Sequence, residues 1–281
     1  MTVAAAAAPA RQIENVSLGL DSEELASTYE RVGTRQFEHG KVLIAALAPK
    51  RGERVLDIGC GTGRLGDYVA SLVVPGGKVT GIDPLPLRID IAARKNPAFE
   101  ASVGRAEDLS PFADRSFDVA YMNSVFHWVE DKARALAEVR RVLKAGGRFG
   151  VNSADAERPH QSAALVREAA LEEGLSHTKV ANALGTNYRV GKDTLGQLLQ
   201  AAGFGDIAVD RHTFVDTLTG VDDLFAWSQS SSFGNFLSDL TPGERERVRA
   251  RLATKLEAFR KPEGIQLERY LVFARALSPR A

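Results

Sequence analysis

The sequence contains a single cysteine, Cys60, among its 281 residues. One thiol cannot form a disulfide within the chain, so the sequence favours a reducing, cytoplasmic compartment. Apolar runs long enough to span a membrane are also missing, and the alanine-rich start lacks the basic segment of a signal peptide. We therefore predict a soluble protein without a membrane partner.

An excess of charge of one sign is absent as well, because 36 acidic residues balance 36 basic ones. A nucleic-acid partner held through its phosphates would need a basic surface, and none is visible in the sequence. The five histidines are scattered without the spacing of metal ligands, and no Gly-x-Ser-x-Gly motif is present. The sequence therefore predicts neither a nucleic-acid partner nor a metal, and it leaves the oligomeric state open.

Glycines are concentrated at the end of one apolar run. Residues 54–58 are rich in Val, Leu and Ile, which fits a strand buried on both faces of a parallel sheet. The glycines that follow let the chain turn sharply and let a ligand approach bare backbone. They are Gly59, Gly61 and Gly63.

A second apolar run ends at Asp83, 20 residues after Gly63. A carboxylate at the tip of the next strand can accept both hydroxyls of a ribose. The two runs together predict a nucleoside-bearing small molecule lying across the carboxyl ends of adjacent strands.

Strand and helix patterns alternate along the chain and predict an α/β fold. We expect a Rossmann-like, mostly parallel seven-stranded sheet with helices on both faces and a helical lid. The expected strands are 54–58, 78–82, 100–103, 117–122, 148–152, 207–214 and 266–276. The expected helices lie within 21–50, 132–143, 163–173, 192–202, 221–237 and 242–260, and Ala145-Gly146-Gly147 should form a turn before the fifth strand.

No linker divides the chain after its start, so one domain is expected over 21–281, preceded by a flexible tail over 1–20. The predicted core covers about 50–152, 191–214 and 266–276. The insertions at about 153–190 and 215–262 should pack over the ligand end of the sheet and form the lid.

The identity of the nucleoside depends on Asp57. The pattern Gly61-x-Gly63-x-x-Gly66 also satisfies the dinucleotide fingerprint. However, a carboxylate beside the loop would repel a pyrophosphate, whereas a ligand with a cationic end tolerates it. The string Val-Leu-Asp-Ile-Gly-Cys-Gly-Thr-Gly over residues 55–63 resembles the first motif of class I S-adenosylmethionine-dependent methyltransferases. This resemblance implies S-adenosyl-L-methionine as cofactor and S-adenosyl-L-homocysteine as product.

The resemblance also implies a set of cofactor contacts. The glycine loop would contact the methionine portion, the residues after the second strand the ribose, and those after the third strand the adenine, with Asp108 a further candidate there. An aromatic residue near the start would fold over the cofactor carboxylate. In order, the implied residues are Asp57, Gly59, Cys60, Gly61, Gly63, Asp83, Pro84, Ala106, Glu107, Asn123 and Tyr29.

Several of these residues have simpler alternatives. Asp57 could cap the loop, Cys60 could fill space beneath it, and Asn123 could be an ordinary turn residue. Tyr29 could belong to the apolar face of a helix.

The acceptor pocket is expected to contain His127, Trp128, Trp227 and Phe233. His127 is the candidate base if the acceptor must lose a proton, and its alternative is packing beside Trp128. The aromatic residues of 221–237 could equally be core. The ending over 269–274 is similar to that of trans-aconitate and malonyl-carrier-protein methyltransferases, which esterify carboxylates.

We therefore expect in-line methyl transfer to a small molecule, with oxygen or carbon as the favoured acceptor atom. An NAD(P)-dependent oxidoreductase is disfavoured by Asp57 and by the Gly146-Gly147 turn pattern before the fifth strand. A non-catalytic binder of the cofactor stays open, and neutral charge argues against a macromolecular acceptor.

Overall fold

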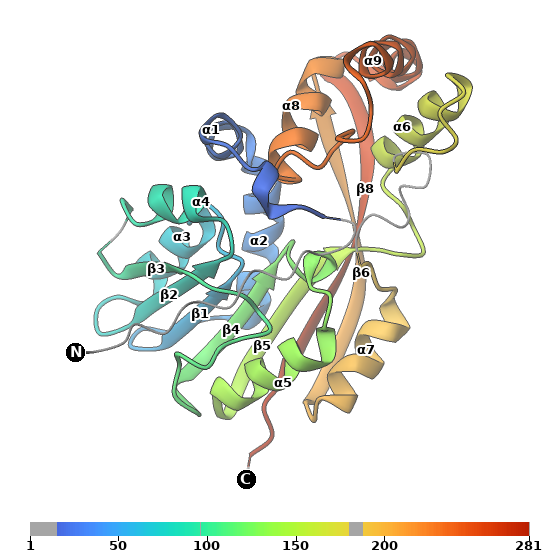
Figure 1. The fold of residues 1–281 in the computed structure, drawn as a ribbon. Coiled ribbons are helices and arrows are strands. Elements are labelled where there is room, and N and C mark those ends of the chain that lie inside the picture. Colours follow the sequence, from blue (N-terminus) through green and yellow to red (C-terminus); the bar gives the residue numbers. More distant parts are fainter. Residues whose placement is uncertain (1–15, 96, 180–187, 281) are drawn as a thin grey trace, which may run out of the picture.

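The computed structural model describes residues 16–95, 97–179 and 188–280 (Figure 1). Its centre is an eight-stranded sheet of order β3-β2-β1-β4-β5-β8-β6, with β7 paired to β8. The strands are β1 Arg54–Ile58, β2 Lys78–Asp83, β3 Phe99–Val103, β4 Phe117–Asn123, β5 Leu143–Ala154, β6 Gly205–Leu218, β7 Arg260–Lys261 and β8 Gly264–Leu277. Strands β1 to β5 pair in parallel, whereas β8 is antiparallel to both β5 and β6. The predicted Rossmann-like, mostly parallel sheet is confirmed, and the two-residue β7 is an addition.

Helices cover both faces of this sheet (Figure 1). Those on one face are α2, α3 and α4, and those on the other are α5 and α7. The helices are α1 Glu23–Val32, α2 Thr34–Leu47, α3 Arg64–Val73, α4 Pro86–Ala92, α5 Lys132–Val142, α6 Gln161–Glu172, α7 Lys192–Ala201, α8 Val221–Ser231 and α9 Pro242–Leu256, with 3-10 turns at Leu18–Leu20, Phe126–Trp128 and Glu257–Phe259.

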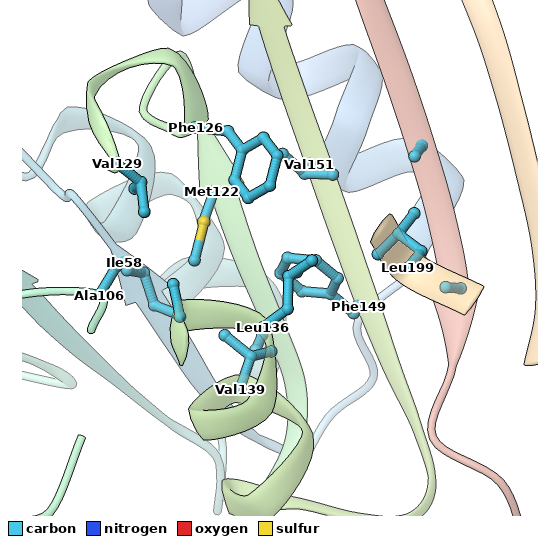
Figure 2. Packing of buried hydrophobic residues seen from close by; sticks show 14 of the residues in the cluster. Ile58, Ala106, Met122, Phe126, Val129, Leu136, Val139, Phe149, Val151 and Leu199 are labelled. Carbon is cyan, nitrogen blue, oxygen red and sulfur yellow. The ribbon is translucent and has the colours of Figure 1, made fainter. Parts of the chain in front are cut away.

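Burial on both faces explains the continuous apolar run of β1. Val55 packs toward α2 and α3, whereas Leu56 and Ile58 pack toward α5 on the opposite face, where Met122 and Phe149 join them (Figure 2). All five side chains are at most 1% exposed. Successive side chains of a strand point to opposite faces, so a strand between two helix layers needs apolar residues at nearly every position.

Strands β6 and β8 extend beyond the predicted 207–214 and 266–276. Their outer ends pair with each other, for example Asp216 with Leu267 and Leu218 with Ile265. The pattern of 215–218 was assigned to the lid because it follows the end of the main sheet. It is strand instead, because the two chain segments satisfy each other's backbone hydrogen bonds without the rest of the sheet.

The expected turn at Ala145-Gly146-Gly147 is a bulge inside β5. The strand already begins at Leu143, and its register against β4 shifts between Phe117 and Val119. Gly146 has φ 73°. Glycine adopts this conformation without steric cost, so the strand continues past the irregularity.

Helices α6, α8 and α9 pack around the extended ends of β6 and β8 (Figure 1). They share a hydrophobic cluster separate from the two layers of the main core, including Leu165, Leu224, Leu252, Ile265 and Leu267. These helices lie beyond the carboxyl ends of β4 and β5, which is where a lid was expected.

The predicted flexible tail over 1–20 falls mostly outside the described residues. Within the described part, 16–20, Val16 is buried, whereas Ser17, Gly19 and Leu20 are exposed. Val16 is 5% exposed and contacts Leu85 and Phe233. The backbone of Ser17 exchanges hydrogen bonds of 2.8 and 2.9 Å with the side chain of Asn235. Val16 is buried because it packs against apolar side chains that are far away in the sequence. A local pattern therefore could not predict this contact.

Candidate functional site

The glycine loop follows β1 at the carboxyl edge of the sheet. Gly59, Gly61 and Gly63 have φ values of 76°, 54° and 79°. A Cβ atom on Gly59 would lie 2.2 Å from Val125, so this position excludes any side chain for steric reasons as well. The Gly59 and Cys60 amides donate to the carbonyl of Ile82 at 2.7 and 2.9 Å, which ties the loop to β2. The sequence prediction of a sharp glycine turn is confirmed.

Asp83 lies at the tip of β2 and is 7% exposed. Its carboxylate accepts hydrogen bonds from the amides of Gly61 at 2.9 Å and Leu85 at 3.0 Å. Burial raises the pKa of Asp83, while the charge of Arg88 and the two amide bonds oppose the rise. A carboxylate has about four acceptor positions, so it can hold the loop and still accept from a ligand hydroxyl.

A cavity beside Asp83 contains the residues expected around the ribose and adenine. It is lined by Asp83, Pro84, Ala106 and Glu107 together with Gly59 and Gly61. We call it the adenosine-side cavity. The further candidate Asp108 is exposed and accepts from the Ser110 amide instead, and it does not line the cavity.

Asp57 lies on the other side of the loop and is 2% exposed. Burial raises its pKa to about 7, the charge of Asp83 adds to the rise, and the Tyr121 hydroxyl opposes it. A small second cavity here is lined by Asp57 and Arg64, so a carboxylate and a guanidinium face the same space. We call it the amino-acid-side cavity. It suits a zwitterion, with the ammonium near Asp57 and the carboxylate near Arg64.

Cys60 fills space beneath the loop. It is 9% exposed, and a Cβ atom on Gly81 would lie 2.9 Å from its sulfur. Burial raises the pKa of the thiol well above its usual value, so the thiol stays protonated. The space-filling alternative for this side chain is therefore supported, and Cys60 can reach a ligand only through its backbone.

Tyr29 lies above the loop, with its ring 3.3 Å from the position of a Cβ atom on Gly61. It lines the adenosine-side cavity, the amino-acid-side cavity and the larger cavity described below. The guanidinium of Arg88 lies 4.5 Å from the centre of the Tyr29 ring. Helix α1 thus places an aromatic ring in the walls of all three cavities.

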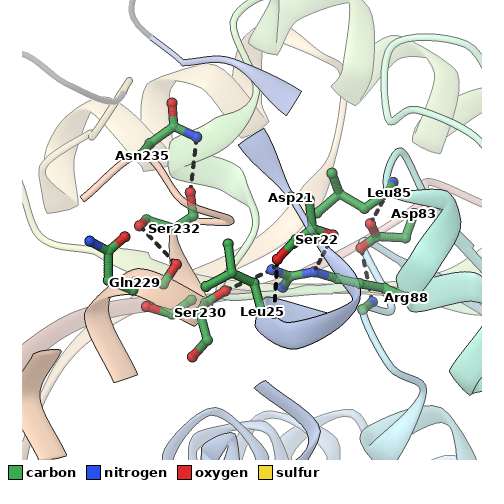
Figure 3. Close-up of polar contacts among 12 residues, drawn as sticks. Asp21, Ser22, Leu25, Asp83, Leu85, Arg88, Gln229, Ser230, Ser232 and Asn235 are labelled. Atoms are coloured by element: carbon green, nitrogen blue, oxygen red, sulfur yellow. Dashed lines mark hydrogen bonds and ion pairs between the residues drawn. The ribbon is translucent and has the colours of Figure 1, made fainter. Parts of the chain in front are cut away.

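Arg88 connects three separate segments around the adenosine-side cavity (Figure 3). From α4 it forms an ion pair with Asp21 at 3.2 Å and donates to the carbonyl of Ser230 in α8 at 2.7 Å. Its side chain is almost fully buried. Sequence reasoning missed Arg88 because its partners are distant in the sequence and no motif marks it.

Asn123 ends β4, and its amide is used within the protein. It donates to the carbonyl of Gln36 at 2.9 Å and accepts from the Asn152 amide at 2.7 Å. The next residue, Ser124, has φ 60°, which is uncommon for a residue other than glycine. Ser124 lines both the adenosine-side cavity and the larger cavity, and no sequence motif marks this residue.

The larger cavity, of about 220 Å³, lies between the sheet edge and the lid. His127, Trp128 and Trp227 line it, which agrees with three of the four predicted pocket residues. Phe233 lines the adenosine-side cavity instead. The expected helix over 221–237 ends at Ser231, and Phe233 has φ 43°, so the chain turns its ring toward Trp128 and away from the lid.

His127 is a neutral imidazole in this environment. Burial lowers its pKa to about 3, and the positive charges of Arg189, Lys132 and Arg269 add to the effect. Its Nδ1 lies 3.3 Å from the Ser153 hydroxyl. A base this weak is poorly matched to removing a proton at neutral pH.

Comparison with known proteins adds independent information. Residues 56–151 match a family described as a methyltransferase domain, and these residues include the glycine loop, Asp83 and His127. Residues 56–151 of the chain therefore carry a methyltransferase domain.

Two curated relatives resemble this methyltransferase domain in sequence. An uncharacterized methyltransferase of Mycobacterium tuberculosis is 42% identical over 105 residues, or 37% of this chain and 41% of the relative. The malonyl-[acyl-carrier protein] O-methyltransferase of Serratia marcescens is 32% identical over 123 residues, or 43% of this chain and 46% of the relative. The chain spans between 34% and 56% of the length of the first curated relatives it matches.

The resemblance to solved structures extends over most of the chain. Phosphoethanolamine N-methyltransferase 2 from Haemonchus contortus, solved with S-adenosyl-L-methionine, gives a TM-score of 0.59 at 18% identity. The match covers 92% of this chain and 58% of that one. At such low identity it demonstrates the shared fold alone.

Clusters of metal-ligating side chains and helices that could cross a membrane are both absent from the described part of the chain. Among residues 16–95, 97–179 and 188–280, no group of three or more metal-ligating side chains lies together. None of the helices formed by these residues is both long and apolar enough to cross a membrane.

Proposed function

We propose that this protein transfers the methyl group of S-adenosyl-L-methionine to a small-molecule acceptor held under the lid. One observation carries the proposal. The adenosine-side cavity and the larger cavity share Tyr29, Ser124 and Trp128 as walls. A donor in the first and an acceptor in the second would therefore meet at the carboxyl end of β4.

The cofactor fits the chemistry of the cavity walls. Asp83 would accept the ribose hydroxyls, and Ala106 and Glu107 would flank the adenine. Asp57 and Arg64 would bind the ammonium and carboxylate of the methionine portion, and Tyr29 would cover it. Because Asn123 is engaged with Gln36 and Asn152, its part is to hold the edge of the site in shape.

Nicotinamide dinucleotides fit these walls less well. The two carboxylates of Asp57 and Asp83 flank the loop, and burial makes the charged form of each costly. A pyrophosphate would add negative charge between them, whereas a sulfonium or an ammonium would offset theirs. The same argument favours the sulfonium cofactor over a dinucleotide.

Methyl transfer needs alignment more than proton chemistry. S-adenosyl-L-methionine would supply the methyl group: an electron pair of an acceptor oxygen or carbon that is already deprotonated would attack the methyl carbon, and the pair of the breaking carbon–sulfur bond would return to sulfur, leaving S-adenosyl-L-homocysteine. Holding donor and acceptor in line supplies most of the catalytic effect. The neutral His127 would orient the acceptor by hydrogen bonding, and oxygen or carbon is the favoured acceptor atom. The zero formal charge of the chain favours a small acceptor over a nucleic acid.

The proposal is tested by calorimetric titration with S-adenosyl-L-methionine, S-adenosyl-L-homocysteine, NADH and NADPH. Micromolar binding of the first two without the nicotinamides is expected. Binding of a nicotinamide instead would overturn the cofactor assignment. Cofactor binding without methyl transfer to any compound of a broad acceptor panel would favour a non-catalytic binder.

A further inference from the structure

More cationic than anionic side chains line the larger cavity. Its charged lining residues are Lys179, Arg189, Arg269 and Asp239, so cations outnumber the one carboxylate. Much of the remaining wall is apolar, including Val166, Leu224, Phe236 and Leu271. Cationic donors beside apolar surface favour an acceptor that has both a negative charge and an apolar body.

Arg269 is the most firmly held of these cations. It projects from β8, is 4% exposed, and its Nε donates to Asp216 of β6 at 2.8 Å, with a second contact from the same guanidinium. The guanidinium also lies 4.2 Å from the centre of the Trp227 ring. These contacts fix its orientation, so little rotamer entropy is lost when it binds a ligand.

Asp216 does not neutralise this region fully, because it serves two arginines. Arg35 lies 3.6 Å from the same carboxylate. Arg35 faces a groove on the outer side of β6 and does not line the larger cavity. Two guanidiniums therefore share the Asp216 carboxylate, and the charge of Asp223 also acts on Arg35.

Arg189 adds a second guanidinium to the cavity wall. Burial lowers its pKa, and the positive charge of Arg269 lowers it further. Burial and the charge of Arg269 both disfavour the charged form of Arg189. An anion placed near the two arginines would reverse the electrostatic part of this cost.

The histidines of the cavity supply neutral donors. The Tyr270 amide donates to Nδ1 of His160 at 3.1 Å, so the proton of the neutral ring lies on Nε2. His160 is 8% exposed and lines the cavity. Burial lowers its pKa well below the usual value, with Arg269 and Arg189 adding to the effect. An imidazole in this state can donate to an anion without needing a charge of its own.

We propose that the acceptor is a small organic carboxylate with an apolar body, whose carboxylate binds at Arg269 and Arg189. This inference rests on the proposed function for its methyl donor. The planar guanidinium fork matches a carboxylate geometrically, and the apolar walls favour a monoanion over a strongly hydrated phosphate dianion. The apolar body would lie against Leu224, Phe236 and Leu271.

The test is calorimetric titration of the protein saturated with S-adenosyl-L-homocysteine. The probes are trans-cinnamate and octanoate, their primary amides, phenyl phosphate and phenethylammonium. At least one carboxylate is expected to bind tenfold or more tightly than its amide, with phenyl phosphate and the ammonium weaker. Equal binding of carboxylate and amide, or tighter binding of phenyl phosphate or the ammonium, would overturn the inference.

Single substitutions test whether Arg189 and Arg269 cause the preference for a carboxylate over its amide. Arg189→Gln and Arg269→Gln should each remove most of the tenfold preference and leave the affinity for S-adenosyl-L-homocysteine within twofold. Arg35→Gln is the matched control, because it removes the same charge beside the same Asp216 but outside the cavity, and it should reduce the preference by less than either cavity variant. Persistence of the preference in both cavity variants would refute the assignment.

A double variant and a titration without S-adenosyl-L-homocysteine distinguish failure of this inference from failure of folding and from failure of the proposed function. Should Arg269→Gln fail to fold because Asp216 loses its contacts with Arg269, the double variant Asp216→Asn with Arg269→Gln removes both charges and takes its place. Failure of S-adenosyl-L-homocysteine to bind would contradict the proposed function. The carboxylate preference can be measured without it, so the charge of the cavity is tested independently.

Discussion

The substitution Asp57→Asn tests the electrostatics of the glycine loop most directly. The carboxyl is 2% exposed, and burial raises its pKa from the usual 3.8 to about 7. Between these two values the folded protein retains a proton that the unfolded chain has released. The free energy of unfolding therefore falls as pH rises through this window and is constant above it.

The magnitude follows from the size of the shift. Each pH unit between the two pKa values lowers the stability of the empty protein by about 1.4 kcal/mol, so the full loss is about 4 kcal/mol. About 2.5 kcal/mol of this is lost between pH 5 and pH 8. An asparagine does not titrate, so the variant lacks this term and should gain about 2.5 kcal/mol relative to wild type over the same interval.

Urea unfolding of both proteins at pH 5 and pH 8 measures this double difference. Other titrating groups largely cancel, because they are common to the two proteins. The contrary result is that Asp57→Asn changes the free energy of unfolding by the same amount at both pH values, within about 0.5 kcal/mol. That result would show that the carboxyl ionises normally, and it would refute the reasoning. Binding supplies a second measurement. The variant should bind S-adenosyl-L-homocysteine more weakly than wild type at pH 8, because the ligand ammonium loses its counter-charge.

Three other changes test the loop, the ribose contact and the imidazole. Gly59→Ala should destabilise the fold by about 2–4 kcal/mol in urea unfolding, since its Cβ atom would lie 2.2 Å from Val125, and Val125→Ala should restore part of the loss; no loss would contradict the steric argument. Asp83→Asn should weaken S-adenosyl-L-homocysteine binding by tenfold or more while the circular dichroism spectrum stays native, and unchanged affinity would remove Asp83 from the ribose site. His127→Asn should lower turnover less than about tenfold and leave the pH profile between 5 and 8 unchanged, because the ring has a pKa of about 3; a loss above a hundredfold together with a changed profile would restore the role of base.

Local patterns in the sequence were sufficient for the core of the fold. The bounds of β1 are those predicted, and β2 and β4 differ by one residue, because short apolar runs between turn signals leave little choice of structure. The extension of β6 over 215–218 was missed, since it depends on pairing with β8, almost fifty residues further along the chain. The bulge at Gly146 was taken for a turn for a related reason. A glycine marks an irregular backbone without saying whether the strand continues beyond it.

The sequence by itself determined the methyltransferase domain, the glycine loop and the position of Asp83, because the residues involved are adjacent or separated by one strand–helix–strand unit. Only the tertiary structure decided which distant side chains meet. Arg88 joins Asp21 and Ser230, Phe233 lines the adenosine-side cavity, and Arg269 pairs with Asp216 in the wall of the larger cavity. Charge and burial at these places depend on neighbours from other elements. The pKa of Asp57 and the positive cavity could therefore not be predicted from any local pattern.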